Sequence, residues 1–148
     1  MKFKWDVSEL TKFADNLRDG WELETALMTA TQNIARVLHQ NLLNLTPVQT
    51  GNLRKMWSAG DNLFFTVEKL KDGYQVTLVN EAKNFAHGNT DFPDGYMYGT
   101  DVNDGHRSRS GGWVKGRFFV EDSITQIAES ARLEQLIMKE LKKWWLSV

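Results

Sequence analysis

The sequence contains no cysteine, so it can form neither a disulfide nor a thiolate metal site, and it offers no cysteine nucleophile. It also lacks an excess of charge of either sign, because 18 basic and 19 acidic residues give a formal net charge of -1. Proteins that hold nucleic acid mainly by electrostatics usually carry a clear basic excess. Any such role would therefore depend on a local patch.

Long apolar runs are missing as well. The first residues, MKFKWDVSEL, contain no apolar segment typical of a signal peptide, and no stretch approaches the roughly 18 apolar residues of a transmembrane helix. We therefore expect no membrane partner and a location in the cytoplasm of the cell that makes the protein. The length of 148 residues fits one domain over residues 1–148.

The N-terminal third predicts two helices, at 8–18 and 21–45. Asp6 can cap the first, which carries apolar residues at helical spacing. The second has a longer apolar stripe of the same period, made of Leu23, Leu27, Ala30, Ile34, Leu38 and Leu42. Pro47 ends this helix, because proline disfavours helical geometry in the residue before it.

The pattern then changes to the alternation of strands within residues 53–80. The clearest alternation lies on either side of the Lys-Asp-Gly turn at 71–73, which predicts a hairpin, and a further strand could begin near 53–58. Residues 81–112 predict a long loop, in which GYMYGT at 95–100 could form a short strand. Residues 118–145 return to helical spacing. We therefore expect an α+β fold, with an antiparallel, hairpin-based sheet packed against a long helix from the N-terminal half and a C-terminal helix.

The loop contains residue types that bind metals, namely His87, His106, Asp91, Asp94, Asp101 and Asp104. Their spacing follows no compact ligand motif, and loop carboxylates usually cap turns or face solvent, so we expect no metal site. Ser108 and Ser110 lie near His106 but form no glycine-serine-glycine elbow, and the glycines at 111–116 lack the spacing of a phosphate-binding loop. We expect no catalytic residue and no cofactor.

The stretch GHRSRSGGWVKGRFF at 105–119 concentrates positive charge without any acidic residue. With Trp113 it could bind single-stranded nucleic acid by charge and stacking, or anchor a protein interface, where arginine and tryptophan are enriched. We expect Gly111 and Gly112 to turn the chain and the segment from Trp113 to Phe119 to pack on the core. The side chains left to face a partner protein would then be His106, Arg107 and Arg109.

Trp144 and Trp145 follow one another in the last predicted helix, so their side chains cannot face the same way. At least one could be exposed in a monomer. Exposed aromatic residues often mark interfaces. Packing against the edge of the sheet and a contact between subunits both stay open for this pair.

Two motifs in the chain belong together. The first lies in TPVQTGNLRKMW at 46–57 and consists of Pro47, Thr50, Gly51, Leu53, Arg54 and Trp57. The second lies in GHRSRSGGWVKGRFFVEDSI at 105–124 and consists of Gly105, His106, Arg107, Gly111, Gly112, Trp113, Val114, Gly116, Arg117, Phe118 and Phe119. In this combination the chain resembles, over residues 20–145, the tail-component family of tailed bacteriophages and prophages. Residues 84–104 look like an expanded loop relative to that family.

The resemblance implies a structural protein of the virion without catalytic activity. Such proteins are tail-completion, head–tail joining or minor tail proteins, found in the neck or at the head-proximal end of the tail and assembled in the host cytoplasm. It further implies a homo-oligomeric ring whose partners are neck, tail, portal or connector proteins. The loop 81–112 and the last helix are the expected contact surfaces. The alternative is a nucleic-acid-binding protein or nuclease that uses the basic loop 106–117.

Overall fold

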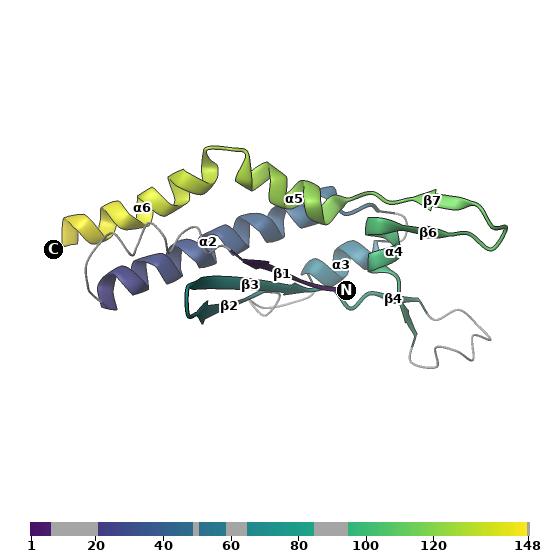
Figure 1. Cartoon of the computed structure of the whole chain (residues 1–148), viewed down its shortest axis with the longest axis horizontal. Helices are drawn as coiled ribbons and strands as arrows, with labels where there is room; N and C mark the ends of the chain where they lie inside the picture. Colours follow the sequence, from purple (N-terminus) through teal and green to yellow (C-terminus); the bar gives the residue numbers. More distant parts are fainter. Residues whose placement is uncertain (7–20, 49–50, 59–64, 85–94, 148) are drawn as a thin grey trace.

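The computed structural model describes residues 1–6, 21–48, 51–58, 65–84 and 95–147. Its elements follow in the order β1 (Lys2–Asp6), α2 (Trp21–Leu45), α3 (Asn52–Ser58), β2 (Phe65–Leu70), β3 (Gly73–Val79), β4 (Lys83–Asn84), β5 (Tyr96–Met97), α4 (Gly99–Asp104), β6 (Gly105–Arg107), β7 (Trp113–Lys115), α5 (Phe119–Ala128) and α6 (Arg132–Ser147) (Figure 1). The fold is α+β, as the sequence predicts. The helix expected at 8–18 lies outside the described residues.

The main sheet has three antiparallel strands in the order β1-β3-β2. The hairpin of β2 and β3 confirms the prediction from alternation, since Tyr74, Val76 and Leu78 of β3 are all buried. Strand β1 was not expected. It pairs along the other edge of β3, with Lys2 opposite Val79. Charged and aromatic residues do alternate in KFKWD, so the period of a strand was present in the sequence but was not used.

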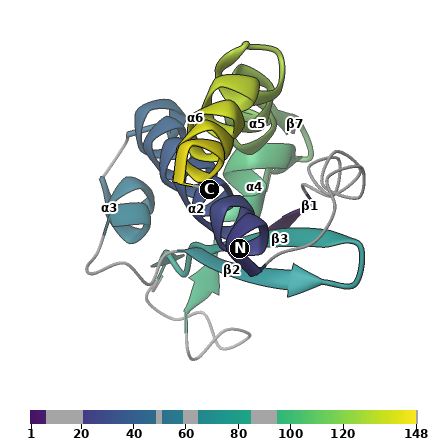
Figure 2. The same ribbon diagram turned by 90° about the vertical axis from the view of Figure 1, so that its left-hand side faces the viewer.

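Helix α2 confirms the helix predicted at 21–45, and its whole expected apolar stripe is buried. Figure 2 shows the reason, because α2 runs between the main sheet on one side and α5 and α6 on the other. Thr31 is buried within this middle layer, and its Oγ1 donates to the carbonyl of Leu27 at 2.8 Å. Neither α2 nor any other helix in the described part of the chain has the combination of length and apolarity needed to cross a membrane.

The single helix predicted over 118–145 is wrong, because the chain forms α5 and α6 with a break at residues 129–131. The break lets each half follow α2 (Figure 1). Ile127 of α5 belongs to the core cluster around Leu42, whereas Leu141 of α6 belongs to the cluster around Leu23. The Oγ of Ser130 donates to the carbonyl of Ile127 at 3.1 Å and satisfies one acceptor at the end of α5.

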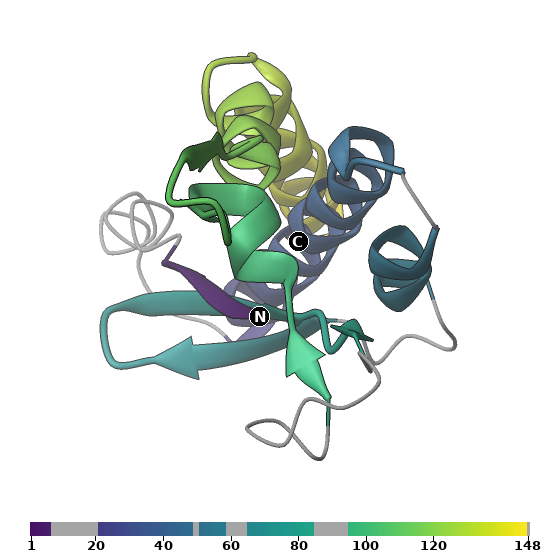
Figure 3. The same ribbon diagram turned by 90° about the vertical axis from the view of Figure 1, so that its right-hand side faces the viewer.

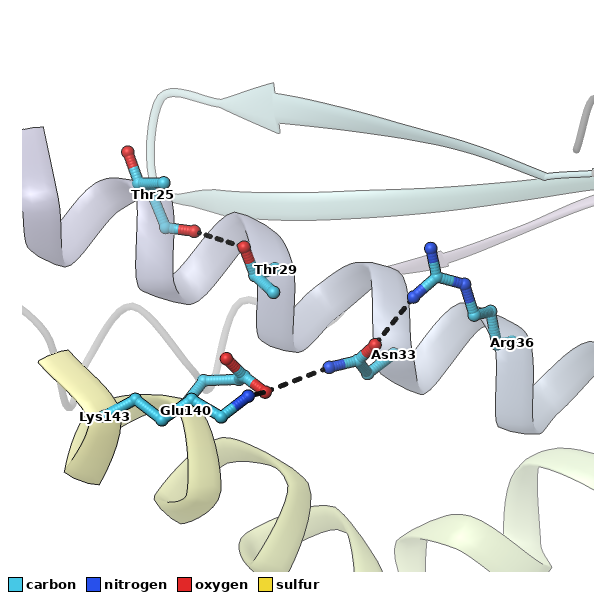
Figure 4. Close-up of polar contacts among 6 residues, drawn as sticks. All are labelled: Thr25, Thr29, Asn33, Arg36, Glu140 and Lys143. Atoms are coloured by element: carbon cyan, nitrogen blue, oxygen red, sulfur yellow. Dashed lines mark hydrogen bonds and ion pairs between the residues drawn. The ribbon is translucent and has the colours of Figure 1, made fainter.

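The contact between α2 and α6 includes a carboxylate that is largely buried, that of Glu140 (Figure 4). Its Oε1 accepts hydrogen bonds from Nδ2 of Asn33 at 3.3 Å and from Nζ of Lys143 at 2.9 Å. Nη1 of Arg36 donates in turn to Oδ1 of Asn33 at 2.8 Å. A buried carboxylate is costly unless it is paired and hydrogen-bonded, so this network helps to set the position of α6 along α2.

Two further predictions are wrong. Residues 53–58, expected as a strand, belong to α3, where Leu53 and Trp57 are buried on one helical face. The interval 81–112, expected as a loop, contains the β4–β5 pair, α4 and β6, although β5 does lie within the 95–100 segment where a short strand was considered. Buried side-chain bonds stabilise this region in place of a regular apolar period. Asn80, for example, donates to the carbonyl of Leu53 at 2.8 Å and accepts from the amide of Ala82 at 3.0 Å.

Candidate functional site

The β6–β7 hairpin, residues 105–115, extends from the body of the molecule at the end opposite the C-terminus of α6 (Figure 1), and we call it the arm. Figure 3 views the molecule from this end. His106 pairs with Val114 in the antiparallel ribbon. At the tip, the amide of Ser108 donates to the carbonyl of Gly112 at 2.8 Å, and Gly111 adopts a φ of 86° that glycine accommodates readily. The expected turn at the two glycines is therefore present.

The base of the arm depends on two other glycines. Gly105 has a φ of 91°, and a Cβ placed on it would lie 2.6 Å from the carbonyl oxygen of Val114. A Cβ on Gly116 would lie 2.2 Å from the carbonyl oxygen of Asn103. Both distances are too short for a side-chain carbon. The arm can therefore join the body only because these two positions allow direct backbone contact.

Asn103 connects the arm to the start of α5. It is 2% exposed, and its Oδ1 accepts from the amide of Val120 at 3.0 Å, which satisfies a donor in the first turn of α5. Its Nδ2 donates to the two carboxylate oxygens of Glu121 at 3.1 and 2.9 Å and to Oδ1 of Asp104 at 2.6 Å. The backbone carbonyl of Asn103 also accepts from the amide of Phe118 at 2.9 Å. One buried residue thus positions both the base of the arm and the helix that follows it.

The expectation that the segment from Trp113 to Phe119 packs on the core is wrong for most of the segment. Trp113 is 69% exposed and Phe118 is 44% exposed, and Val114 is exposed too, whereas Phe119 is 1% exposed. Phe118 adopts a left-handed φ of 49° directly before α5, so it points away from the side where Phe119 packs. Trp113 and Val114 lie on the ribbon outside the body, where no core reaches them, and Phe118 lies between the ribbon and α5.

A pocket of about 640 Å³ opens beside the arm. It brings the two sequence motifs together, since one wall comes from the segment around α3 and another from β6 and the tip of the arm. The remaining wall comes from β4, β5 and α4. Its lining consists of Pro47, Gly51, Asn52, Leu53, Lys83, Tyr96, Tyr98, Asp101, Val102, His106, Arg107, Ser108 and Arg109.

The lining of the pocket has more positive than negative charge, because Lys83, Arg107 and Arg109 are accompanied by the single carboxylate of Asp101. The hydroxyl of Tyr96 donates to Oδ2 of Asp101 at 2.6 Å. This hydrogen bond, together with burial and the charge of Asp101, raises the pKa of Tyr96 above its ordinary value. The three cations outnumber the one carboxylate, so the lining carries a net positive charge.

His106 is half-buried in the pocket wall. Its Nδ1 is buried, and among the described residues it has no hydrogen-bond partner. Ser108 and Ser110 bond to each other through their hydroxyls at 3.0 Å. In the part of the chain that the structure covers, no three histidine or acidic side chains gather as metal ligands would. His87, Asp91 and Asp94 lie outside those residues, and Asp104 contacts Asn103 instead.

The remaining residues of the motifs are spread around the site. Gly112 lies at the exposed tip of the arm, and Arg54 is exposed on α3. Arg117 is also exposed, although its amide donates to the carbonyl of Val102 at 2.9 Å and so belongs to the base of the arm. Thr50 lies outside the described residues.

The tryptophan pair lies far from the pocket, at the C-terminal end of α6 (Figure 1). Trp144 is half-buried against the core cluster of Leu23 and Leu141, whereas Trp145 is 70% exposed. Their ring centroids are 6.3 Å apart in an edge-to-face arrangement. Trp144 therefore packs on the body, and Trp145 is exposed, as expected for at least one member of the pair.

Sequence reasoning missed several residues of the site. Lys83, Tyr96 and Tyr98 line the pocket but belong to no motif. Only the expanded loop 84–104 could have drawn attention to them, because it contains the two tyrosines and directly follows Lys83. Nothing in the sequence distinguishes Asn103 from the other asparagines of the interval. Comparison of the chain with protein-family models, with curated protein sequences and with solved structures finds no match.

Proposed function

We propose that this protein is a structural component of a phage or prophage virion, located at the neck or tail, which assembles into a ring that completes the tail or joins it to the head. The two motifs that resemble the tail-component family support the proposal. The arm also supports the proposal, and it is the observation on which the proposal mainly rests. A two-stranded ribbon is marginally stable alone, and this one exposes Trp113 and Val114 next to Arg107 and Arg109, a composition typical of protein interfaces.

A second apolar surface suits a ring. Trp145 and Leu146 are exposed at the end of α6, opposite the arm (Figure 1). A ring needs a heterologous interface, in which one surface of each subunit meets a different surface of the next. The arm and the end of α6 supply two such surfaces at opposite ends of the molecule. We therefore propose that neighbouring subunits meet arm to α6.

Self-association is tested by light scattering and negative-stain electron microscopy over a range of protein concentrations. We expect the wild type to form species larger than a monomer, and both Trp113→Ser and Trp145→Ser to reduce them. Leu70→Ser is the control, because it removes an exposed apolar side chain that lies on β2 and so belongs to neither the arm nor α6. A wild type that stays monomeric at every concentration, alone and with purified tails, would contradict assembly into a ring.

The role in the virion is tested by deleting the gene from the phage or prophage that carries it. We expect filled heads and separate, incomplete tails to accumulate, and we expect the wild-type gene to restore joined particles when supplied in trans. The Trp113→Ser gene should restore fewer of them. Joined, infectious particles produced without the protein would refute the role.

The alternative is binding to single-stranded nucleic acid, and one observation favours it. The arm presents the exposed cations Arg107, Arg109 and Lys115 with the exposed ring of Trp113, which combines charge with a stacking surface. A labelled oligothymidine should then bind with an affinity that falls as salt rises, and Arg107→Ala with Arg109→Ala should abolish the binding. Absence of binding at low salt would eliminate this alternative.

A further inference from the structure

The pocket beside the arm combines two kinds of lining. Lys83, on β4, and Arg107 and Arg109, on the arm, bring positive charge from two separate parts of the fold. Apolar surface lies between them, contributed in part by Leu53 and Val102. Sites that bind organic ligands are typically concave, with apolar walls and a few placed polar groups, and the volume of about 640 Å³ is within their usual range.

We propose that this pocket binds an acidic peptide segment of a partner protein, in which a carboxylate lies next to an apolar side chain. The carboxylate contacts the guanidinium groups of Arg107 and Arg109 and the ammonium group of Lys83, and the apolar side chain rests on Leu53 and Val102. The inference rests on the proposed function, because it names the chemistry of the partner that docks beside the arm. It does not depend on how the subunits associate with one another.

The composition of the pocket favours a carboxylate over a phosphate chain. Arginine forms paired hydrogen bonds with either group. A nucleic-acid backbone, however, brings several negative charges in a row and little aliphatic surface. Asp101 would repel such a chain, and the apolar wall would be left without a partner. A peptide with one or two carboxylates instead matches three cations and one anion, and it can cover the apolar wall.

His106 provides a second reason to expect an occupant. Its Nδ1 is buried without a hydrogen-bond partner among the described residues, and a buried polar atom in that state is rare because it costs free energy. A rotation of the His106 ring would bring this nitrogen to the surface of the pocket, where a polar group of the bound peptide would be its partner. His106 lines the pocket next to Arg107, on the same strand β6.

The test uses a synthetic peptide with alternating glutamate and leucine or phenylalanine, labelled with a fluorophore, and the full-length protein at low salt. A second peptide replaces each glutamate with glutamine, and a third replaces each apolar residue with glycine. Binding is measured by fluorescence anisotropy and located by chemical-shift changes in NMR spectra. Inorganic phosphate and oligothymidine are tested as competitors. We expect the acidic, apolar peptide to bind at least about tenfold more tightly than either control peptide, the factor that corresponds to one charge-assisted hydrogen bond.

Three variants locate the binding. Arg107→Ala with Arg109→Ala should weaken it about tenfold or more, and Lys83→Ala should weaken it several-fold from the other side of the pocket. Lys115→Ala is the matched control, because Lys115 is an exposed cation of the same arm that does not line the pocket. All four side chains are at least partly exposed, so the variants should fold as the wild type does. We expect Lys115→Ala to leave the affinity nearly unchanged.

Each other outcome overturns the inference. Equal binding of the glutamine peptide would show that no carboxylate is recognised, and an equal loss in Lys115→Ala would show attraction to the general charge of the arm. Displacement by oligothymidine at lower concentration than by unlabelled peptide would assign the pocket to phosphate groups. Absence of peptide binding at low salt would refute the inference that the pocket binds an acidic peptide. Failure of the proposed function looks different, because a protein that neither assembles nor joins virions could still bind the peptide through Lys83, Arg107 and Arg109.

Discussion

Gly116→Ala should destabilise the protein far more than the same change at Gly111 or Gly112, the two glycines at the tip of the arm. The new Cβ would lie 2.2 Å from the carbonyl oxygen of Asn103 and 2.5 Å from the carbonyl carbon of Asp104. Both atoms belong to the backbone, so no side chain can rotate to make room. The segment that joins α4 to the arm would have to move by about an ångström to restore ordinary van der Waals contact.

The free-energy change follows from what that movement disturbs. The carbonyl of Asn103 accepts from the amide of Phe118, and the side chain of Asn103 accepts from the amide of Val120 at the start of α5. Overpacking of a tight site usually costs about 1–3 kcal/mol. Because backbone and two hydrogen bonds are strained together here, we expect about 3 kcal/mol. In a chain of this size that corresponds to a fall of about 6–12 °C in Tm.

Two glycines of the same arm serve as controls. A Cβ on Gly112 would meet only the hydroxyl of Ser108, at 3.4 Å, so Gly112→Ala should change the free energy of unfolding by less than about 0.5 kcal/mol. Gly111 has open space around it but a φ of 86°, so alanine there should cost about 1 kcal/mol in backbone strain alone. Urea unfolding followed by tryptophan fluorescence gives all three values. If Gly116→Ala is no more destabilising than Gly112→Ala, the description of the base of the arm is wrong.

Three other changes test the surroundings of the arm. Asn103→Ala should lower the free energy of unfolding by about 3 kcal/mol, because it removes a helix cap and leaves buried polar groups without partners, and a loss below about 1 kcal/mol in urea unfolding would contradict this role. Trp113→Ser should leave the free energy of unfolding within about 0.5 kcal/mol of the wild-type value, because the side chain of Trp113 is largely exposed. Phe119→Ala should lower it by about 3–5 kcal/mol, because Phe119 is buried. Equal losses in the same assay would refute the assignment of the exposed and buried aromatic residues. The pKa of Tyr96 is raised above its ordinary value of 10.0 in the folded protein, because its hydroxyl donates to Asp101. This hydrogen bond therefore stabilises the fold fully at pH values below 10.0, and the stabilisation is lost as the pH rises through the higher pKa of the folded state. In tyrosinate absorbance, Asp101→Ala should shift part of the titration to lower pH, and an unchanged titration curve would exclude the bond.

The sequence predicts those elements whose burial repeats with a regular period. Helix α2 buries one stripe over 25 residues, and the β2–β3 hairpin alternates around a recognisable turn, so both follow from local spacing. The break between α5 and α6 does not follow from local spacing. No glycine or proline marks residues 129–131, so the sequence carries none of the usual signals for a break there.

The candidate site was predictable only in part. Its charged residues, Arg107 and Arg109, are conspicuous in the sequence because the stretch 105–119 that contains them has no acidic residue. The exposure of Trp113 was not predictable, since a large aromatic residue beside a helix start is normally assigned to the core. Whether it packs depends on where the ribbon leaves the body. That point is set by backbone contacts at Gly105 and Gly116, and a sequence pattern does not reveal contacts between backbones.

The two motifs lie about fifty residues apart in the sequence, and the structure gives a physical reason for their association. Gly51 and Leu53 from the first motif and His106 and Arg107 from the second line the same pocket. Asn80 bonds to the carbonyl of Leu53 and so positions α3 against the end of the main sheet. A change in either motif would alter the shape or the charge of one shared surface. The structure therefore joins part of each motif in one site rather than in two separate ones.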